Sequence, residues 1–322
     1  MSLKSNPISR LSRVRVGLTI GDPSGIGPAV TLKALKALKK APADFVVIGD
    51  AGILKKIPGA NIMDLKNLNL RDFSFGKIKA EYGKASVEYL DKALELLKDK
   101  EIDCLVTAPI SKEAINKAGF KYSGHTEYFG KKTRAKEVVM LLLNDKLKFC
   151  LVTRHIPIGK VPRALTKKKL YSSILIVYKS LKYLFGIKKP RLVVCGLNPH
   201  ASDNGIIGTE EKRVIKPVLK KLKAKIKPDI DGPLSSDVAV SRAAAGNYDC
   251  VIAMYHDQAL IPLKLTGGSS GVNMTLGLPF IRTSPLHGTA FDIASTPELA
   301  DPTSMIAAIK LAIQCASQQK KA

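Results

Sequence analysis

Short runs of apolar residues alternate along the chain with segments in which apolar residues recur every three or four positions. A continuous apolar run predicts a buried strand, and the helical period predicts an amphipathic helix. The first third of the chain predicts strands at 14–20, 45–49 and 104–108 and helices at 28–40 and 84–100. Residues 57–80 show neither pattern and are expected to form a loop or a small hairpin, and Ser111 is expected to cap a short helix.

The middle of the chain begins with two apolar runs, 138–143 and 147–154, separated by a short polar turn. This arrangement predicts a hairpin, so the sheet should contain strands of both directions. Further helices are expected at 166–184, 210–225, 237–245 and 302–319. Strands that alternate with helices in this way indicate an α/β fold, and the length of 322 residues favours two domains.

Composition narrows the class of protein. The hydrophobic content of 45% and mean hydropathy of +0.04 are ordinary for a globular chain. No apolar stretch approaches the roughly 18 residues of a membrane span, and residues 1–15 lack the apolar core of a signal peptide. The five cysteines are far apart and lie mostly in apolar runs, which predicts buried thiols in a reducing cytoplasm.

The net charge of +25 raises the question of nucleic-acid binding. The lysines are, however, spread along the whole chain on the polar faces of predicted helices, tryptophan is absent and no base-stacking motif occurs. We therefore expect a solvated lysine-rich surface that neither binds nucleic acid nor enters a membrane. Its positive field would attract anionic substrates such as phosphates and dinucleotides.

Three of the five histidines follow apolar runs that are typical of buried strands. They are His155 after residues 147–154, His200 after 192–199 and His256 after 250–255. Because ligands of α/β proteins bind outside the carboxyl ends of strands, the three imidazoles are placed to share a metal ion. Taken singly, each would be an ordinary partly buried ring. Asp237 and Asp257 add carboxylates nearby in sequence.

Two glycine-containing segments are candidates for anion binding. Residues 21–28 fit neither the dinucleotide fingerprint nor the P-loop, but they join a strand to a helix N-terminus, which favours anions. A plain structural turn explains them equally well. Residues 124–127, Gly-His-Thr-Glu, are expected to form a polar loop in which His125 and Thr126 offer hydrogen bonds to a carboxylate or phosphate. A histidine without a role is the alternative there.

Lys264, Asn273 and Arg282 flank the glycine-rich segment 267–271. Two cations and an amide beside a flexible loop suit a phosphate clamp, in which the arginine supplies paired hydrogen bonds. Exposed charges beside a surface loop are the alternative. A further polar loop, 283–292, carries the fifth histidine.

Together these segments closely resemble the 4-hydroxythreonine-4-phosphate dehydrogenase family of the pyridoxal phosphate pathway. The resemblance covers nearly the whole chain, from about residue 16 to 294, with its motifs in the same order. The motifs are 21–28, 107–112, 122–129, 196–200, 254–258 and 271–284.

The resemblance implies a two-domain fold like that of isocitrate and isopropylmalate dehydrogenases, with the active site in the cleft between the domains. Residues 1–135 plus 263–322 would bind the cofactor, and residues 136–262 would carry the metal and the dimer contact. The chain would act as a homodimer with a shared active site. A divalent ion, Zn, Mg or Co, would be held by His155, His200 and, from the partner subunit, His256. The implied substrate contacts are His125, Thr126, Asp237, Asp257, Lys264, Asn273 and Arg282.

The implied reaction is oxidation of 4-phosphohydroxy-L-threonine by NAD, or by NADP, followed by loss of carbon dioxide from the β-keto acid. The proton acceptor is expected to be Asp237 or Asp257, with His125 as a third candidate. The sequence departs from the family at Ala29, at residues 202–205, where the family favours Gly-Glu-Gly-Gly, and at Ser269-Ser270, where Gly-Arg is common.

Three alternatives stay open at this point. A sibling dehydrogenase acting on the four-carbon sugar-acid 4-phosphates, erythronate or threonate 4-phosphate, is the nearest. The aromatic residues around the Gly-His-Thr-Glu segment favour the amino-acid substrate over it. A metal-dependent hydrolase that does not use NAD and a nucleic-acid binder are the other two.

Overall fold

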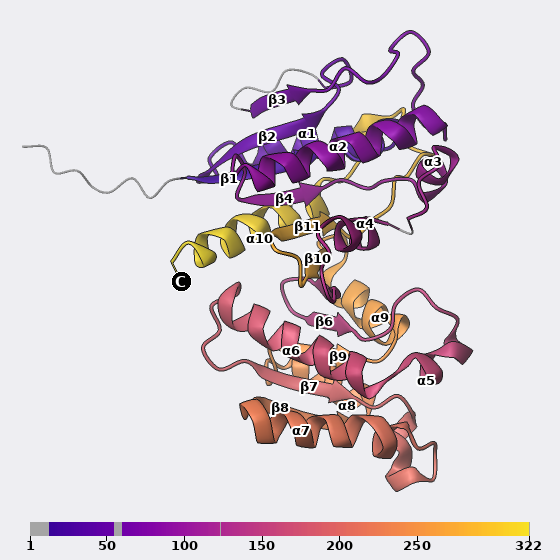
Figure 1. The fold of residues 1–322 in the computed structure, drawn as a ribbon, viewed down its shortest axis with the longest axis vertical. Helices are drawn as coiled ribbons and strands as arrows, with labels where there is room; N and C mark the ends of the chain where they lie inside the picture. The colour runs from indigo at the N-terminus through magenta and orange to yellow at the C-terminus, as the bar shows by residue number, and fades with distance from the viewer. Residues whose placement is uncertain (1–12, 55–59, 123, 322) are drawn as a thin grey trace, which may run out of the picture.

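One sheet runs the length of the molecule in a computed structural model that describes residues 13–54, 60–122 and 124–321 (Figure 1). Residues 1–12, which contain most of the segment searched for a signal peptide, lie outside the described residues, as do 55–59 and Ser123. The eleven strands of the sheet are β1 Val14–Thr19, β2 Ala43–Gly49, β3 Ala60–Asp64, β4 Cys104–Thr107, β5 Val139–Leu143, β6 Lys148–Leu151, β7 Arg191–Cys195, β8 Asp229–Leu234, β9 Cys250–Ala253, β10 Val272–Leu276 and β11 Ile281–Pro285.

The strand order is β3-β2-β1-β4-β11-β10-β5-β6-β9-β7-β8. The pairs β11–β10, β10–β5 and β5–β6 are antiparallel, and the remaining pairs are parallel. The predicted α/β class with a mixed sheet is therefore confirmed, and strands from both predicted domains join in one sheet. The domain boundaries themselves stay a prediction.

Helices cover both faces of this sheet (Figure 1). The α-helices are α1 Gly27–Ala37, α2 Ala80–Lys98, α3 Lys112–Lys117, α4 His125–Lys132, α5 Val161–Ala164, α6 Lys167–Tyr183, α7 Lys216–Ile226, α8 Ser236–Ala244, α9 His256–Gly267 and α10 Thr303–Gln319. The C-terminal α10 packs on β1, β4, β10 and β11, so the end of the chain returns to the N-terminal half.

Most predicted elements are confirmed to within a few residues. The hairpin forms as β5 and β6, and Ser111 caps α3 by accepting a hydrogen bond from the Ala114 backbone N–H at 3.1 Å. Two expectations were wrong. The region 57–80 contains β3, which pairs in parallel with β2, so the expected hairpin is wrong, whereas residues 65–79 form a loop as the other alternative expected. His125 is the first residue of α4 and does not lie in a loop.

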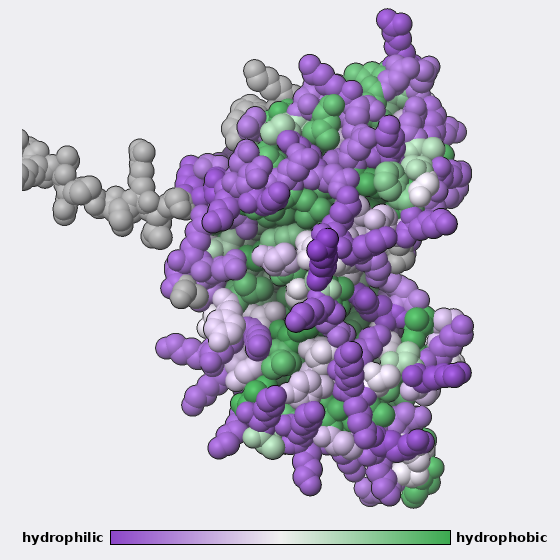
Figure 2. All heavy atoms as spheres, viewed as in Figure 1, coloured by the Kyte–Doolittle hydropathy of each residue, from purple (hydrophilic) through white to green (hydrophobic). Residues whose placement is uncertain are grey.

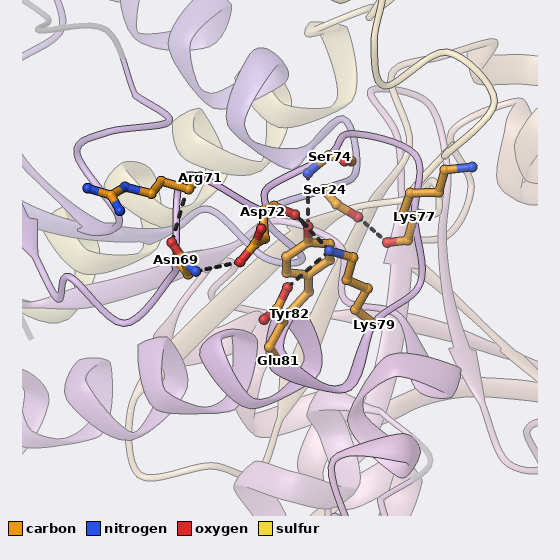
Figure 3. A network of polar contacts seen from close by, with 9 residues as sticks. All are labelled: Ser24, Asn69, Arg71, Asp72, Ser74, Lys77, Lys79, Glu81 and Tyr82. Carbon is orange, nitrogen blue, oxygen red and sulfur yellow. Dashed lines mark hydrogen bonds and ion pairs between the residues drawn. The ribbon is translucent and has the colours of Figure 1, made fainter.

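The long segment after β3 is held by its own polar network (Figure 3). The Tyr82 hydroxyl accepts a hydrogen bond from the Ser74 backbone N–H at 2.9 Å, and Lys79 Nζ donates to the Asp72 carbonyl at 2.7 Å. Ser24 Oγ donates to the Lys77 carbonyl at 2.6 Å. The glycine-rich turn between β1 and α1 is thereby anchored to this segment.

Hydrophilic residues cover most of the face in Figure 2 and extend over both halves of the molecule. This spread agrees with the expectation of a dispersed lysine-rich surface. All five cysteines are buried free thiols, as predicted. Among the described residues, no helix has the length and apolar character needed to cross a membrane.

Candidate active site

A cavity of about 430 Å³ lies over the middle of the sheet. Its floor is formed by one face of β4, β11, β10 and β5. The strand register places Asn273 opposite Ser284, and Thr275 opposite both Arg282 and Met140, so these side chains share that face. The cavity is thus built where the antiparallel strands meet, on a sheet face and not at a row of carboxyl ends.

Residues from distant parts of the chain complete the walls. His125 and Thr126 come from the first turn of α4, and Lys264 comes from α9. The loop after β11 contributes His287, and His155 reaches the cavity from the segment after β6. These side chains come from positions spread between residues 125 and 287, so only the fold brings them together.

Arg282 is the most informative residue of the floor. Its side chain is almost fully buried, with 1% of its surface exposed. Its Nη2 and Nε donate to Thr107 Oγ1 at 2.6 and 3.1 Å, and its Nη1 donates to Thr275 Oγ1 at 3.1 Å. No ion pair joins it to a carboxylate within the described part of the chain. Burial lowers the pKa of the guanidinium to about 9, so it remains a cation at neutral pH.

A buried cation with only neutral partners is costly unless an anion arrives to compensate it. Thr107 and Thr275 fix the guanidinium in place but carry no charge. The arrangement therefore provides a preorganised site for an anionic group, and a phosphate matches the planar fork of donors.

Three further polar atoms at this cavity are buried without a hydrogen-bond partner: His125 Nε2, Asn273 Oδ1 and His287 Nε2. Burial and the positive charge of Arg282 hold the pKa of His125 well below 6.5, so its ring is neutral. Buried polar groups in native proteins are normally paired. Three unpaired atoms around one cavity indicate that a polar ligand supplies the missing partners.

Of the three histidines that follow strands, His155 and His256 lie together and His200 lies apart. β6, β9 and β7 are parallel neighbours, so their carboxyl ends do share one edge. The rings of His155 and His256 lie with their centroids 5.6 Å apart, and His256 Nδ1 bonds Asp257 Oδ1 at 2.6 Å. His200 does not join them: the described residues of one chain gather no group of three or more histidine, cysteine or acidic side chains able to hold a metal ion.

His200 begins a turn with an unusual backbone. Residues 200–204 all have φ between 42° and 72°, although none of them is glycine. This left-handed region favours glycine because it has no Cβ to clash. The family that the sequence resembles is expected to favour glycine at two of these positions, 202 and 204. The departure at 202–205 therefore places side chains on a strained backbone next to a predicted metal ligand.

The structure thus divides the predicted site residues into two groups. The cavity gathers His125, Thr126, His155, Lys264, Asn273 and Arg282. His256 adjoins the cavity through His155, whereas His200, Asp237 and Asp257 do not line it, and all three are exposed. Sequence reasoning did not name Thr107, Lys112 and His287 as site residues, although all three line the cavity. Thr107 and His287 lie at or just after the carboxyl end of a buried strand, which is the signal that pointed to the other histidines.

Known proteins that are similar to this chain in sequence and structure are dehydrogenases. A crystal structure of a 4-hydroxythreonine-4-phosphate dehydrogenase from Klebsiella pneumoniae is similar to this chain, with a TM-score of 0.87 and 35% identity over 96% of this chain and 100% of that one. A 4-hydroxythreonine-4-phosphate dehydrogenase from Sulfurihydrogenibium is 45% identical over 93% of this chain and 98% of its own. A D-threonate 4-phosphate dehydrogenase from Salmonella typhimurium is 39% identical over 94% and 98%. The protein is an oxidoreductase with a dehydrogenase fold.

A protein-family model matches most of the chain. The family model described as pyridoxal phosphate biosynthetic protein PdxA matches residues 19–312. The chain belongs to the PdxA family, as the motifs of the sequence indicated.

Proposed function

We propose that the protein oxidises 4-phosphohydroxy-L-threonine with NAD to 2-amino-3-oxo-4-phosphohydroxybutanoate, which then decarboxylates to 3-amino-2-oxopropyl phosphate. The observation that carries this proposal is Arg282, a buried cation at the floor of a polar cavity whose hydrogen-bond partners are neutral threonine hydroxyls. The names of the relatives at 45% and 35% identity support the substrate. The pathway would be the biosynthesis of pyridoxal 5′-phosphate.

In this proposal the phosphate lies against Arg282, with Lys264 and Asn273 on its other sides. His125 Nε2 accepts a hydrogen bond from a donor on the substrate, and Thr126 is linked to Arg282 through Thr275, whose Oγ1 lies 3.4 Å from Thr126 Oγ1. Binding the phosphate away from the reacting carbon would orient that carbon for hydride transfer.

The oxidation moves a hydride from the hydroxyl-bearing carbon to the nicotinamide ring and the hydroxyl proton to a base. Of the three candidate bases, only His125 lines the cavity of its own chain, and its neutral, unpaired nitrogen suits a proton acceptor. Asp237 and Asp257 are exposed and would have to act across a subunit interface.

The residues present fit a divalent metal in part. Imidazole nitrogens suit Zn or Co better than Mg, and His155 and His256 already lie side by side. When bound, such an ion supplies Lewis-acid chemistry by lowering the pKa of a substrate hydroxyl. We propose His155, His200 and His256 as its ligands, with the partner subunit completing a set that the described residues of one chain do not bring together.

We propose a homodimer because the histidine ligands are incomplete within one chain's described residues and because large apolar side chains are exposed near them. Large apolar side chains are exposed on and near the elements that carry these histidines: Ile158, Ile206, Ile261 and Leu265. Ile261 and Leu265 lie one turn apart on α9 with 60% and 82% of their surface exposed. The buried free thiols support a site of action in the cytoplasm.

A second candidate is dehydrogenation of D-threonate 4-phosphate or erythronate 4-phosphate, favoured by relatives of 38% and 39% identity that are named for the former. The two candidates are separated by measuring NADH formation with each phosphate in the presence of added metal. We expect the higher kcat/KM with 4-phosphohydroxy-L-threonine. A higher value with D-threonate 4-phosphate would transfer the assignment to the second candidate.

A further inference from the structure

A single buried amide joins the carboxyl ends of three neighbouring strands. Gln258 is the third residue of α9 and has 7% of its surface exposed. Its Oε1 accepts a hydrogen bond from the Met254 backbone N–H at 2.6 Å, and its Nε2 donates to the Gly196 carbonyl at 2.9 Å and to Ser236 Oγ at 2.6 Å. The side chain therefore bonds the turns that follow β9, β7 and β8, which are neighbours in the sheet (Figure 1).

Each of these three turns carries one residue of the proposed site. The turn after β9 carries His256, the turn after β7 carries His200, and the turn after β8 carries Asp237. The bonds of Gln258 go to two backbone groups and one serine hydroxyl. Gln258 can therefore act on the three side chains through the position of the backbone that carries them.

The turn that carries His200 packs closely against the backbone that Gln258 bonds. A Cβ added at Gly196 would lie 2.9 Å from Ala201 Cα, which is closer than a Cβ approaches another atom in folded proteins. Glycine allows this approach because it has no side chain. Since Ala201 directly follows His200, a shift of the Gly196 backbone would displace the His200 backbone as well.

The same turn is held from its other side by Glu211, whose side chain is fully buried. Its Oε1 accepts hydrogen bonds from the Leu197 N–H at 2.7 Å and the Asn198 N–H at 2.8 Å, and its Oε2 accepts one from Asn198 Nδ2 at 2.9 Å. Glu211 begins a single π-helical turn, Glu211–Ile215, a feature that is frequent at functional sites. The backbone before His200 is therefore fixed by side chains from two different helices.

We propose that Gln258 is a positioning residue that fixes the placement of His200, His256 and Asp237 relative to one another at this edge of the sheet. The inference rests on the proposed function, because it takes the two histidines as metal ligands. Groups that orient metal ligands from outside the coordination sphere typically contribute about 10- to 100-fold to metal affinity. Because Gln258 holds the turns of two ligands at once, its loss should weaken metal binding as well as lower stability.

Asn144 provides a matched control that bonds the same helix. It is a buried amide with 6% of its surface exposed. Its Nδ2 donates to the Leu263 carbonyl at 2.9 Å, and its Oδ1 accepts from the Leu147 N–H at 2.8 Å. It thus joins the β5–β6 turn to the second half of α9, where no proposed metal ligand lies. Comparing the two amides separates an effect on the site from a general loss of stability.

The test is a titration of the full-length protein with Zn²⁺ alone, together with the visible absorption spectrum of the protein loaded with Co²⁺. Wild type is expected to bind Zn²⁺, and His200→Ala is expected to lose that binding. Gln258→Met removes the amide at nearly constant length and is expected to weaken Zn²⁺ binding at least about tenfold. It should also change the Co²⁺ spectrum, which reports the coordination geometry.

Asn144→Leu should lower the melting temperature as Gln258→Met does, because both changes leave buried polar groups unpaired. Its Zn²⁺ affinity should nevertheless stay within about twofold of wild type, since the change lies away from the ligand turns, and its Co²⁺ spectrum should be unchanged.

Gln258→Asn is a second variant in case Gln258→Met does not fold. It keeps the amide but is shorter by one methylene, so it cannot bond all three turns directly. Water can bridge the remaining gaps and satisfy the buried groups. We expect the protein to fold and its Zn²⁺ affinity to fall by about tenfold.

The outcomes separate this inference from the proposed function. If His200→Ala loses Zn²⁺ binding while Gln258→Met and Gln258→Asn bind Zn²⁺ as tightly as wild type, the positioning role is wrong and the proposed ligands stand. Equal losses of Zn²⁺ affinity in Gln258→Met and Asn144→Leu would also overturn the positioning role. If His200→Ala binds Zn²⁺ as tightly as wild type, or wild type binds none, the ligand assignment of the proposed function fails, and the inference fails with it.

Discussion

At the scale of single residues, the cavity contains buried polar groups whose desolvation is not compensated within the described residues of the free protein. The Arg282 guanidinium is removed from water on folding and donates hydrogen bonds to two threonine hydroxyls instead. His125, Asn273 and His287 each leave a buried atom unpaired. A fold selected for stability alone would replace these groups, so they indicate a site that is preorganised for binding at the expense of the free protein.

Replacing Arg282 with methionine tests this reasoning. Because the change removes a buried charge and keeps an apolar stem, we expect the melting temperature of the ligand-free variant to be no lower than that of wild type. Stabilisation by inorganic phosphate should disappear, since its main partner is gone. Differential scanning calorimetry with and without phosphate measures both. A variant that melts well below wild type, yet is still stabilised by phosphate, would mean that Arg282 is structural.

Asp22 provides a second test at residue scale. It is fully buried, Oδ2 has no partner, and burial raises its pKa from 3.8 to about 6. Between these values the unfolded chain loses the proton first, so stability falls as pH rises from about 4 to 6 and the cost is complete above 6. Asp22→Asn keeps the acceptor for the Ser24 N–H at 3.0 Å and removes the ionisation.

We therefore expect Asp22→Asn to be about as stable as wild type near pH 4 and more stable by about 2–3 kcal/mol above pH 6. Denaturant unfolding across that pH range gives the difference directly. The exposed Asp292→Asn is the control and should show no such pH-dependent gain. A gain for Asp22→Asn that is constant with pH would show that Asp22 does not titrate as described.

At the scale of elements, hydrophobic periodicity was sufficient for most of the fold. The apolar runs at 14–20 and 104–108 became β1 and β4, and the helical period at 84–100 became α2, because burial of one face decides both kinds of element. The start of α4 was missed because Gly124 and His125 resemble a polar loop, and only the burial of Thr126, Tyr128 and Phe129 in the fold shows that a helix begins there. The left-handed turn at 200–204 has no periodic signal at all.

That turn gives a prediction at element scale. Asp203 is exposed with φ 42° and ψ 60°, a left-handed conformation that is strained for a residue with a Cβ. Asp203→Gly removes this strain, and the stability gained is larger than the stability lost because glycine makes the unfolded chain more flexible. We expect a gain of about 0.5–1 kcal/mol in the free energy of unfolding. Asp203→Ala keeps the Cβ and should give no gain. Equal effects of the two substitutions in urea unfolding would show that the backbone there is not strained.

At the scale of the whole molecule, the active site depends on pairings between distant parts of the chain. β11 pairs with β4, and β10 pairs with β5, across sequence separations that no local pattern reveals. For this reason the sequence could indicate a phosphate clamp at Lys264, Asn273 and Arg282 but could not show that its floor is a sheet face, nor that Thr107 orients the arginine. The strand-end argument did predict the shared edge of β6, β9 and β7 correctly.

The proposed homodimer is tested by Leu265→Asp. Leu265 has 82% of its surface exposed, so a charge there is tolerated by the monomer but not by an apolar subunit contact. We expect sedimentation velocity to show a dimer for wild type and a monomer for the variant, and we expect the variant to lose bound zinc if ligands are shared between subunits. Lys310→Asp, on the exposed face of α10, is the control for added negative charge. A variant that remains dimeric and retains zinc would place the contact elsewhere.

The central claim is that Arg282 binds the phosphate of a substrate that this cavity oxidises. The most direct measurement is kcat/KM for NADH formation from 4-phosphohydroxy-L-threonine in wild type and in Arg282→Met, with metal added. Loss of charge-assisted hydrogen bonds worth roughly 3 kcal/mol predicts a fall of about 100-fold, and the substrate without its phosphate should be turned over equally poorly by both proteins. A variant that retains kcat/KM within about threefold of wild type for the phosphorylated substrate would contradict the account.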